Sequence, residues 1–164
     1  MAVKWNLLKS GKNKIKVTLD RFIWDHQGAV RTVFHEYSIR TTRTAQINAP
    51  TTTGALRNSM FPFTRFKARG NKRIFQGGVA SNKIYAKAME EGMRPANVPY
   101  YNLVDWARMK GAENPYAMAF SVKRRISRQG LPKRDFMKKA LIRHKDWLKR
   151  KLSVIIEKAW KERY

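Results

Sequence analysis

Apolar residues recur at helical spacing between about Thr18 and Asn48. They form one stripe, at spacings of seven, four and three residues, that is typical of the buried face of a helix: Ile23, Val30, Phe34 and Tyr37. Thr18 is suited to cap the start of this helix, and Pro50 is suited to end it. The pattern therefore predicts a long N-terminal helix over these residues.

Two segments rich in aromatic and β-branched residues follow, Phe61–Arg69 and Lys72–Ala80, with Gly70-Asn71 between them. A two-residue loop that opens with glycine favours a tight turn, so the pair predicts an antiparallel β-hairpin. Pro62 cannot donate a backbone hydrogen bond and belongs at a strand start or on an edge strand. Gly77-Gly78 indicates a bulge or the close approach of another backbone.

Turn and capping residues mark two short helices in the second half of the chain. Asn102 resembles a helix cap, and Gly111 is placed to close the helix that it opens. Asn114 followed by Pro115 is a typical helix start, and Gly130 is placed to end that second helix.

A long C-terminal helix opens at Pro132 or Asp135. Its apolar stripe consists of Met137, Leu141, His144, Leu148, Leu152, Ile155 and Ala159. Together these elements predict an α+β fold: a long N-terminal helix, an antiparallel hairpin or small sheet, two short helices and a long C-terminal helix. We expect one domain over residues 1–164, with residues 1–17 as a basic N-terminal arm.

Charge adds a strong constraint on partners. The chain has 36 Lys and Arg against 11 Asp and Glu, for a net charge of +25, and the excess is spread along its whole length. Such a field attracts polyanions, of which nucleic acid is the commonest, and an acidic protein surface is the alternative. No apolar run approaches the roughly 20 residues of a membrane-spanning helix, so we expect no membrane partner.

Candidate catalytic groups are sparse. The chain has no cysteine, and His26, His35 and His144 show no metal-ligand spacing. The one adjacent pair of acids, Glu90-Glu91, points in two directions on either a helix or a strand and makes a poor joint ligand. We therefore expect no enzyme: no catalytic residue, no cofactor and no metal.

Three segments, taken in order, resemble the signatures of one viral family. Ala49–Met60 reads APTTTGALRNSM, Val79–Gly92 reads VASNKIYAKAMEEG, and Gly130–Ala140 reads GLPKRDFMKKA. They are similar to the patterns A-P-v-d-T-G-x-L-r-x-S-i, v-g-s-x-x-x-Y-A-x-x-v-E-x-G and P-x-R-P-F-m-x-p-A of the lambdoid-phage gene-product-ten-like tail-component family. Thr52 stands where that family often has Asp, and Asp135 stands where Pro is commoner.

The resemblance implies a structural virion protein of a tailed bacteriophage. It would be a ring subunit, a hexamer by expectation, of the head–tail connector (neck or tail completion) around the DNA channel. Its partners would be neighbouring neck and tail proteins, with possible non-specific contact with genomic DNA. It would be assembled in the host cytoplasm and sit at the head–tail junction of the virion.

Two sets of residues are candidates for these contacts. Those for subunit contacts are Thr53, Gly54, Leu56, Arg57, Tyr85, Glu90 and Glu91. Those for the DNA channel or an acidic partner are Arg65, Lys67, Arg69, Lys72, Arg73, Lys138, Lys139, Arg143, Lys149 and Arg150. Thr53 and Gly54 are suited to a sharp turn, and Thr53 to Ser59 equally fits a turn that only maintains the fold. Tyr85 equally fits a place in the core. A tail terminator and a free-standing basic nucleic-acid-binding protein are the alternative functions.

Overall fold

The computed structural model describes residues 4–7, 14–19, 25–50, 54–70 and 72–162, with side chains from residue 25 onward except at positions 69 and 72. These residues belong to two compact units. Unit 1 comprises Met1–Asn48, Met60–Ser81 and Phe136–Tyr164, and unit 2 comprises Ala49–Ser59 and Asn82–Asp135. Because each unit is assembled from segments far apart in the chain, no linker in the sequence marks the division.

Unit 1 contains a four-stranded antiparallel sheet. Its strands are β1 (Lys4–Leu7), β2 (Lys14–Leu19), β3 (Met60–Arg69) and β4 (Lys72–Ser81), in the spatial order β1-β2-β4-β3. The predicted hairpin is therefore confirmed as β3–β4. Of the segment expected to be a basic arm, residues 4–7 and 14–17 belong instead to β1 and β2.

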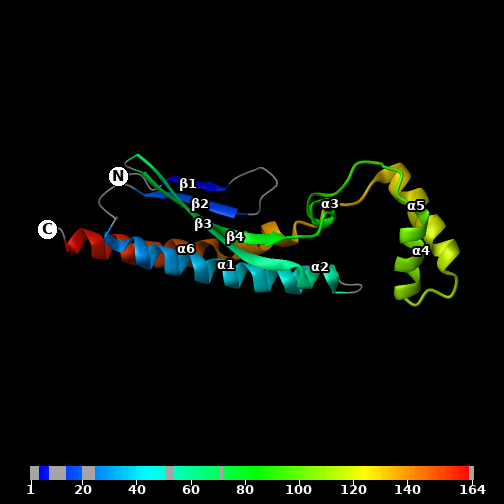
Figure 1. Cartoon of the computed structure of the whole chain (residues 1–164), viewed down its shortest axis with the longest axis horizontal. Coiled ribbons are helices and arrows are strands. Elements are labelled where there is room, and N and C mark those ends of the chain that lie inside the picture. The colour runs from blue at the N-terminus through cyan, green and yellow to red at the C-terminus, as the bar shows by residue number, and fades with distance from the viewer. Residues whose placement is uncertain (1–3, 8–13, 20–24, 51–53, 71, 163–164) are drawn as a thin grey trace. The chain divides into compact units, whose positions relative to one another are not determined.

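Two long helices lie side by side along one face of this sheet, α1 (Gln27–Asn48) and α6 (Phe136–Lys161) (Figure 1). They run antiparallel, since His26 just before α1 pairs with Glu162 just after α6 at 3.0 Å. The predicted long helices and the α+β fold are confirmed. The predicted start at Thr18 was wrong, because Thr18 belongs to β2 and the helix begins at Gln27.

The core of unit 1 lies between the sheet and the helix pair. It consists of Val30, Phe34, Tyr37, Phe75, Leu141, Leu148 and Leu152. Its helix residues all belong to the two stripes predicted for α1 and α6, and Phe75 comes from β4. Ile23 of the first predicted stripe lies outside the described residues. Tyr37 donates its hydroxyl hydrogen bond to Leu141 O at 3.0 Å, and burial raises the pKa of this phenol well above its usual range.

α1 comes unusually close to the sheet at Gly77. A Cβ on this glycine would lie 2.9 Å from Phe34 Cδ1 and 2.9 Å from Ser38 Oγ. The β3–β4 register continues past this point without an extra residue, with Thr64 opposite Gly77. Of the two expectations for Gly77-Gly78, the close backbone approach is therefore the one that the structure confirms.

Unit 2 contains four helices: α2 (Ala55–Asn58), α3 (Ala86–Glu91), α4 (Tyr100–Met109) and α5 (Pro115–Gln129). α4 and α5 pack against each other. The predicted start of α5 is confirmed, because the Asn114 side chain accepts a hydrogen bond from Ala117 N and Pro115 is the first helical residue. The cap predicted at Asn102 was wrong, since α4 already begins at Tyr100 after Pro99.

A short antiparallel bridge joins the segment after α3 to the segment after α5. Met93 N donates to Leu131 O at 3.0 Å, and Leu131 N donates to Met93 O at 2.9 Å. Gly92 and Gly130, both with positive φ, flank the bridge, where a Cβ would collide with the opposite backbone. Asp135 also has a positive φ, 54°, which proline cannot adopt.

Candidate functional surfaces

The segment Ala49–Met60 connects α1 to β3 and folds around the short helix α2. Gly54 precedes α2 with a φ of 72°, which confirms the sharp turn expected at this glycine. Leu56 is buried, whereas Arg57 is exposed. Thr53 lies outside the described residues. Of this first group of candidates, Arg57 is therefore the side chain that another molecule can reach.

The second signature begins in the last three residues of β4 and contains α3. Tyr85 precedes α3 and is 46% exposed, so the alternative of a core tyrosine is not what the structure has. Glu90 is buried, and its backbone oxygen accepts hydrogen bonds from Arg134 N and Asp135 N. Glu91 is exposed and lies 3.9 Å from Lys87. The two adjacent acids thus point into different environments, as their spacing predicts.

The hairpin places its basic residues on two faces of the sheet. Arg65 and Lys67 are exposed and alternate with Phe66, which packs against Phe75 on the helix-covered face. Arg65 and Lys67 therefore point to the opposite face, which no described helix covers and which is called the uncovered face below. By strand register, positions 14 and 16 of β2 belong to that same face. The side chains of Arg69 and Lys72 are outside the described part of the chain.

Arg73 is separated from Arg65 and Lys67. It is partly buried on the helix-covered side, with its guanidinium 6.0 Å from the centroid of the Phe66 ring. Arg31 of α1 lies over the same ring at 4.3 Å. Sequence reasoning missed Arg31, because only the packing of α1 on β3 brings it to Phe66, and no local pattern around either residue signals the pairing.

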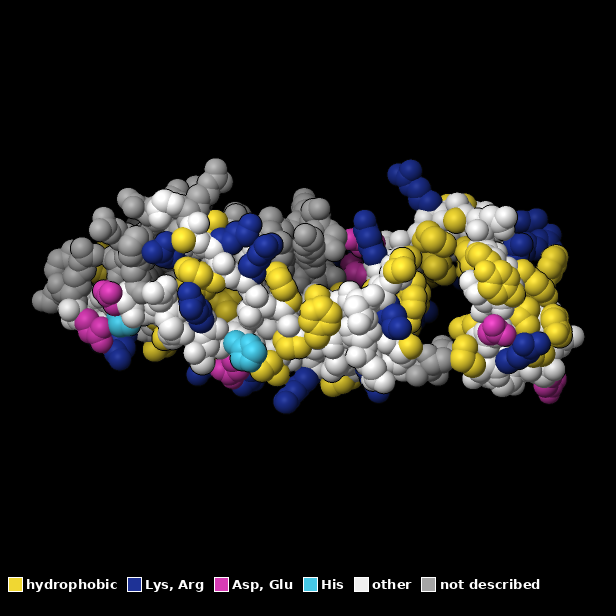
Figure 2. All heavy atoms as spheres, in the orientation of Figure 1, with side chains coloured by type: hydrophobic (Ala, Val, Ile, Leu, Met, Phe, Trp, Pro, Cys, Tyr) yellow, Lys and Arg dark blue, Asp and Glu magenta, His cyan; other side chains and the backbone are white. Residues whose placement is uncertain are grey.

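α6 carries a second basic surface. Lys138, Lys139, Arg143 and Arg150 are exposed, and the partly buried Lys149 lies 3.8 Å from Asp146. On the face seen in Figure 2, Lys and Arg side chains are spread over both units rather than gathered in one cluster. The basic candidates therefore form several separate surfaces, which suit diffuse contacts with a polyanion better than a single specific site.

The described residues contain no group of three or more His, Asp and Glu side chains that could hold a metal ion. His144 bonds with Thr44 at 2.8 Å between the two long helices, which is a packing role, whereas His35 is exposed. Among the helices that are described, none is long and apolar enough to cross a membrane. What the structure does present is a set of exposed cations on rigid elements.

The chain was compared with known protein families, curated proteins and solved structures. No protein family, curated protein or solved structure matches the chain.

Proposed function

We propose that this protein is a structural subunit of a tailed bacteriophage, in the ring that joins the DNA-filled head to the tail. The observation that carries the proposal is the position of the three signature segments in the fold. The first connects a long helix to a β-hairpin, the second begins in the last strand of the hairpin, and the third leads into the long C-terminal helix. In the family that these segments resemble, the first signature likewise follows a long N-terminal helix and leads into a β-hairpin.

The charge distribution supports a place beside DNA. Arg65 and Lys67 stand on the uncovered face of a rigid hairpin, and α6 carries further exposed cations. A channel that lets DNA pass needs weak, sequence-independent contacts, because tight binding would stall the DNA. Cations spread over rigid elements, without a base-reading helix or loop, supply contacts of that kind.

Subunit contacts are assigned to the exposed residues among the candidates named for them: Arg57, Tyr85 and Glu91. An arginine and a glutamate on one chain allow head-to-tail pairing in a closed ring, in which each copy offers both partners. Each copy carries a charge of +25, so identical subunits repel one another at low ionic strength. We therefore expect salt or DNA to favour the ring.

The mass of the purified full-length protein tests this proposal. Light scattering at about 50 mM and about 500 mM salt, with and without duplex DNA, would report assembly. A discrete ring-sized oligomer at high salt or with DNA, visible as a ring by electron microscopy, is the expected result. Arg57→Glu should lower the fraction of protein in the ring-sized oligomer and raise the fraction of monomer. Arg57→Glu combined with Glu91→Arg should restore part of the oligomer.

The alternative functions predict different results. A free-standing nucleic-acid-binding protein would stay monomeric and bind duplex DNA tightly at about 150 mM salt, which would overturn the proposal. A tail terminator would also form a ring. It would be distinguished by adding to isolated tails rather than to DNA-filled heads.

A further inference from the structure

β3 is an edge strand of the sheet. In the order β1-β2-β4-β3 it is hydrogen-bonded to β4, and within the described residues it has no strand on its other side. It is ten residues long, Met60–Arg69. An edge of this length presents a row of backbone donors and acceptors that can pair with another extended chain.

The direction of these backbone groups follows from Ser38. Its Oγ accepts from Gly78 N at 3.0 Å and lies 2.9 Å from Phe63 O, so the Phe63 carbonyl is directed toward β4. Because backbone polar groups alternate in direction along a strand, those of Thr64 and Phe66 are directed to the open edge. Pro62 occupies an open-edge position too, where its missing N–H breaks no bond to β4.

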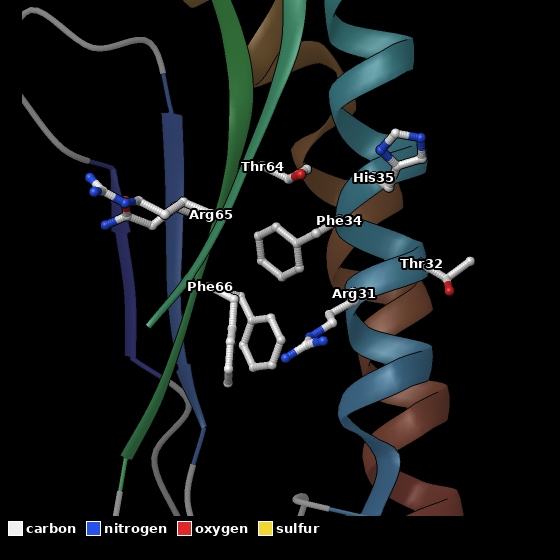
Figure 3. A pocket seen from close by; sticks show the side chains of 9 residues that line it. Arg31, Thr32, Phe34, His35, Thr64, Arg65 and Phe66 are labelled. Atoms are coloured by element: carbon white, nitrogen blue, oxygen red, sulfur yellow. The ribbon is translucent and has the colours of Figure 1, made fainter. Parts of the chain in front are cut away.

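A pocket of about 560 Å³ lies between this edge and α1. α1 contributes Arg31, Thr32, Phe34 and His35, and the sheet contributes Thr64, Arg65, Phe66, Phe75 and Gln76. Figure 3 shows Arg31, Phe34 and Phe66 directed into the gap between helix and strand, with Arg65 directed away from it. The edge strand thus has an aromatic and cationic recess on one face and the exposed Arg65 and Lys67 on the other.

Arg31 is a cation without a carboxylate partner in the described part of the chain. Its recorded contact is the Phe66 ring at 4.3 Å, which holds the guanidinium at the rim of the pocket. The nearby Glu36 is already paired with Arg40 at 2.7 Å. A guanidinium held in this way is prepared to bind an incoming carboxylate, because its position is set before the ligand arrives.

We propose that an acidic, extended segment of another protein docks on β3 as an added strand. Its backbone pairs with Thr64 and Phe66 at the open edge. Its acidic side chains meet Arg31 on the helix-covered face and Arg65 or Lys67 on the other face. This inference goes beyond the proposed ring and does not depend on it, because the edge and the pocket belong to a single chain.

An acidic partner is favoured over a second copy of this chain and over DNA. A second copy would bring its own charge of +25 and only 11 acidic residues against this surface. Duplex DNA would satisfy the cations, but it offers no row of amide groups to match the free strand edge. The combination of an unpaired backbone edge with cations on both faces is specific to an acidic peptide.

Binding of a defined probe to the full-length protein tests the proposal. The probe is a fluorescein-labelled ten-residue Glu-Val peptide with the repeat Glu-Glu-Val-Val, which places glutamates on both faces of an added strand, and its binding is measured by anisotropy at about 150 mM salt. The matched probe has the same sequence with a methyl group on every backbone nitrogen, so its charge is unchanged and neither of its edges can donate hydrogen bonds to β3. We expect the N-methylated probe to bind at least about tenfold more weakly. Bound probe should also slow hydrogen exchange at the Thr64 and Phe66 amides.

Two protein variants separate strand docking from general attraction to a basic protein. Arg31→Gln should weaken binding of the Glu-Val probe about fivefold or more, whereas Arg43→Gln, an equal charge change at an exposed position of the same helix, should leave it nearly unchanged. Thr64→Pro should abolish binding, since it removes an open-edge N–H at a position equivalent to that of Pro62. Equal binding of the two probes, equal effects of Arg31→Gln and Arg43→Gln, or no binding at about 1 mM probe would each overturn the proposal. If duplex DNA displaced the probe completely and Arg31→Gln bound the probe as tightly as the wild type, the surface would be a nucleic-acid-binding one instead.

Discussion

Ser38 of α1 and Gly78 of β4 are joined by a hydrogen bond of 3.0 Å from the glycine N–H to the serine Oγ. The same Oγ lies 2.9 Å from Phe63 O on β3. One helix side chain thus contacts both strands of the hairpin at the place where helix and sheet come closest. The adjacent Gly77 makes this approach possible, because it has no side chain to hold the two layers apart.

Ser38→Ala should destabilise the protein by about 1–3 kcal/mol, because it leaves the buried Gly78 N–H without its acceptor. Ser153→Ala is the matched control. Its hydroxyl makes the same type of bond within a helix, to Lys149 O at 3.1 Å, but it is exposed and contacts no strand. Urea denaturation of both variants measures the difference. A Ser38→Ala protein no less stable than Ser153→Ala would contradict the bridging role.

Gly77→Ala should cost about 1–3 kcal/mol, because the added Cβ would lie 2.9 Å from both Phe34 Cδ1 and Ser38 Oγ. Gly28→Ala is the matched control on α1, since a Cβ there meets nothing within 4 Å. We expect Gly28→Ala to be neutral or slightly stabilising, because alanine favours the helix over glycine. Thermal unfolding of the two variants side by side gives the comparison. Equal midpoints of thermal unfolding for the two variants would show that the sheet can move away from α1 with little loss of stability.

Several elements could be predicted because their signals are local. The stripe Val30, Phe34 and Tyr37 has helical spacing, and the β3–β4 turn opens with a glycine that has the expected positive φ. β2 was missed although its signal was present. Residues 14–19 alternate between polar and apolar types, as strands do, but the high density of lysine favoured the interpretation as an arm. The pairing with β4, which lies far along the chain, is what makes this segment a strand.

The candidate surfaces were predicted less completely, for a physical reason. Exposure of Arg65 and Lys67 follows from strand alternation and could be expected. The burial of Leu56 and Glu90 depends on what packs over them, which no local pattern carries. The Arg31–Phe66 contact and the free edge of β3 depend on tertiary packing and on strand order. Sequence patterns predict which elements form more reliably than which faces of them stay open.

His144 makes stability depend on pH in a defined direction. Burial first, then the charges of Arg143 and Arg40, lower the pKa of His144 below its usual 6.5. The unfolded chain therefore binds a proton more readily than the folded one, so stability is complete above about pH 6.5 and falls as the pH drops below it. The stability of the wild type should decrease between about pH 7 and about pH 5 more steeply than that of His144→Gln. His35→Gln, which changes an exposed histidine of α1, is the control and should retain the wild-type slope.

Replacing the two exposed cations on the uncovered face of β3 should weaken DNA binding in a salt-dependent way. Each phosphate contact contributes about one unit to the slope of log affinity against log salt, so Arg65→Gln with Lys67→Gln should reduce that slope by about two. Arg124→Gln with Arg125→Gln on α5 is the matched control, with the same loss of charge from exposed positions in unit 2. Anisotropy of a labelled duplex over about 50–300 mM salt provides both slopes. If the slope fell by a similar amount in the two double variants, DNA affinity would depend on net charge alone. The uncovered face of the hairpin would then not be a DNA-binding surface. Because Arg65 and Lys67 project from a ladder of paired strands, their replacement should leave the unfolding midpoint unchanged, which separates lost contacts from lost structure.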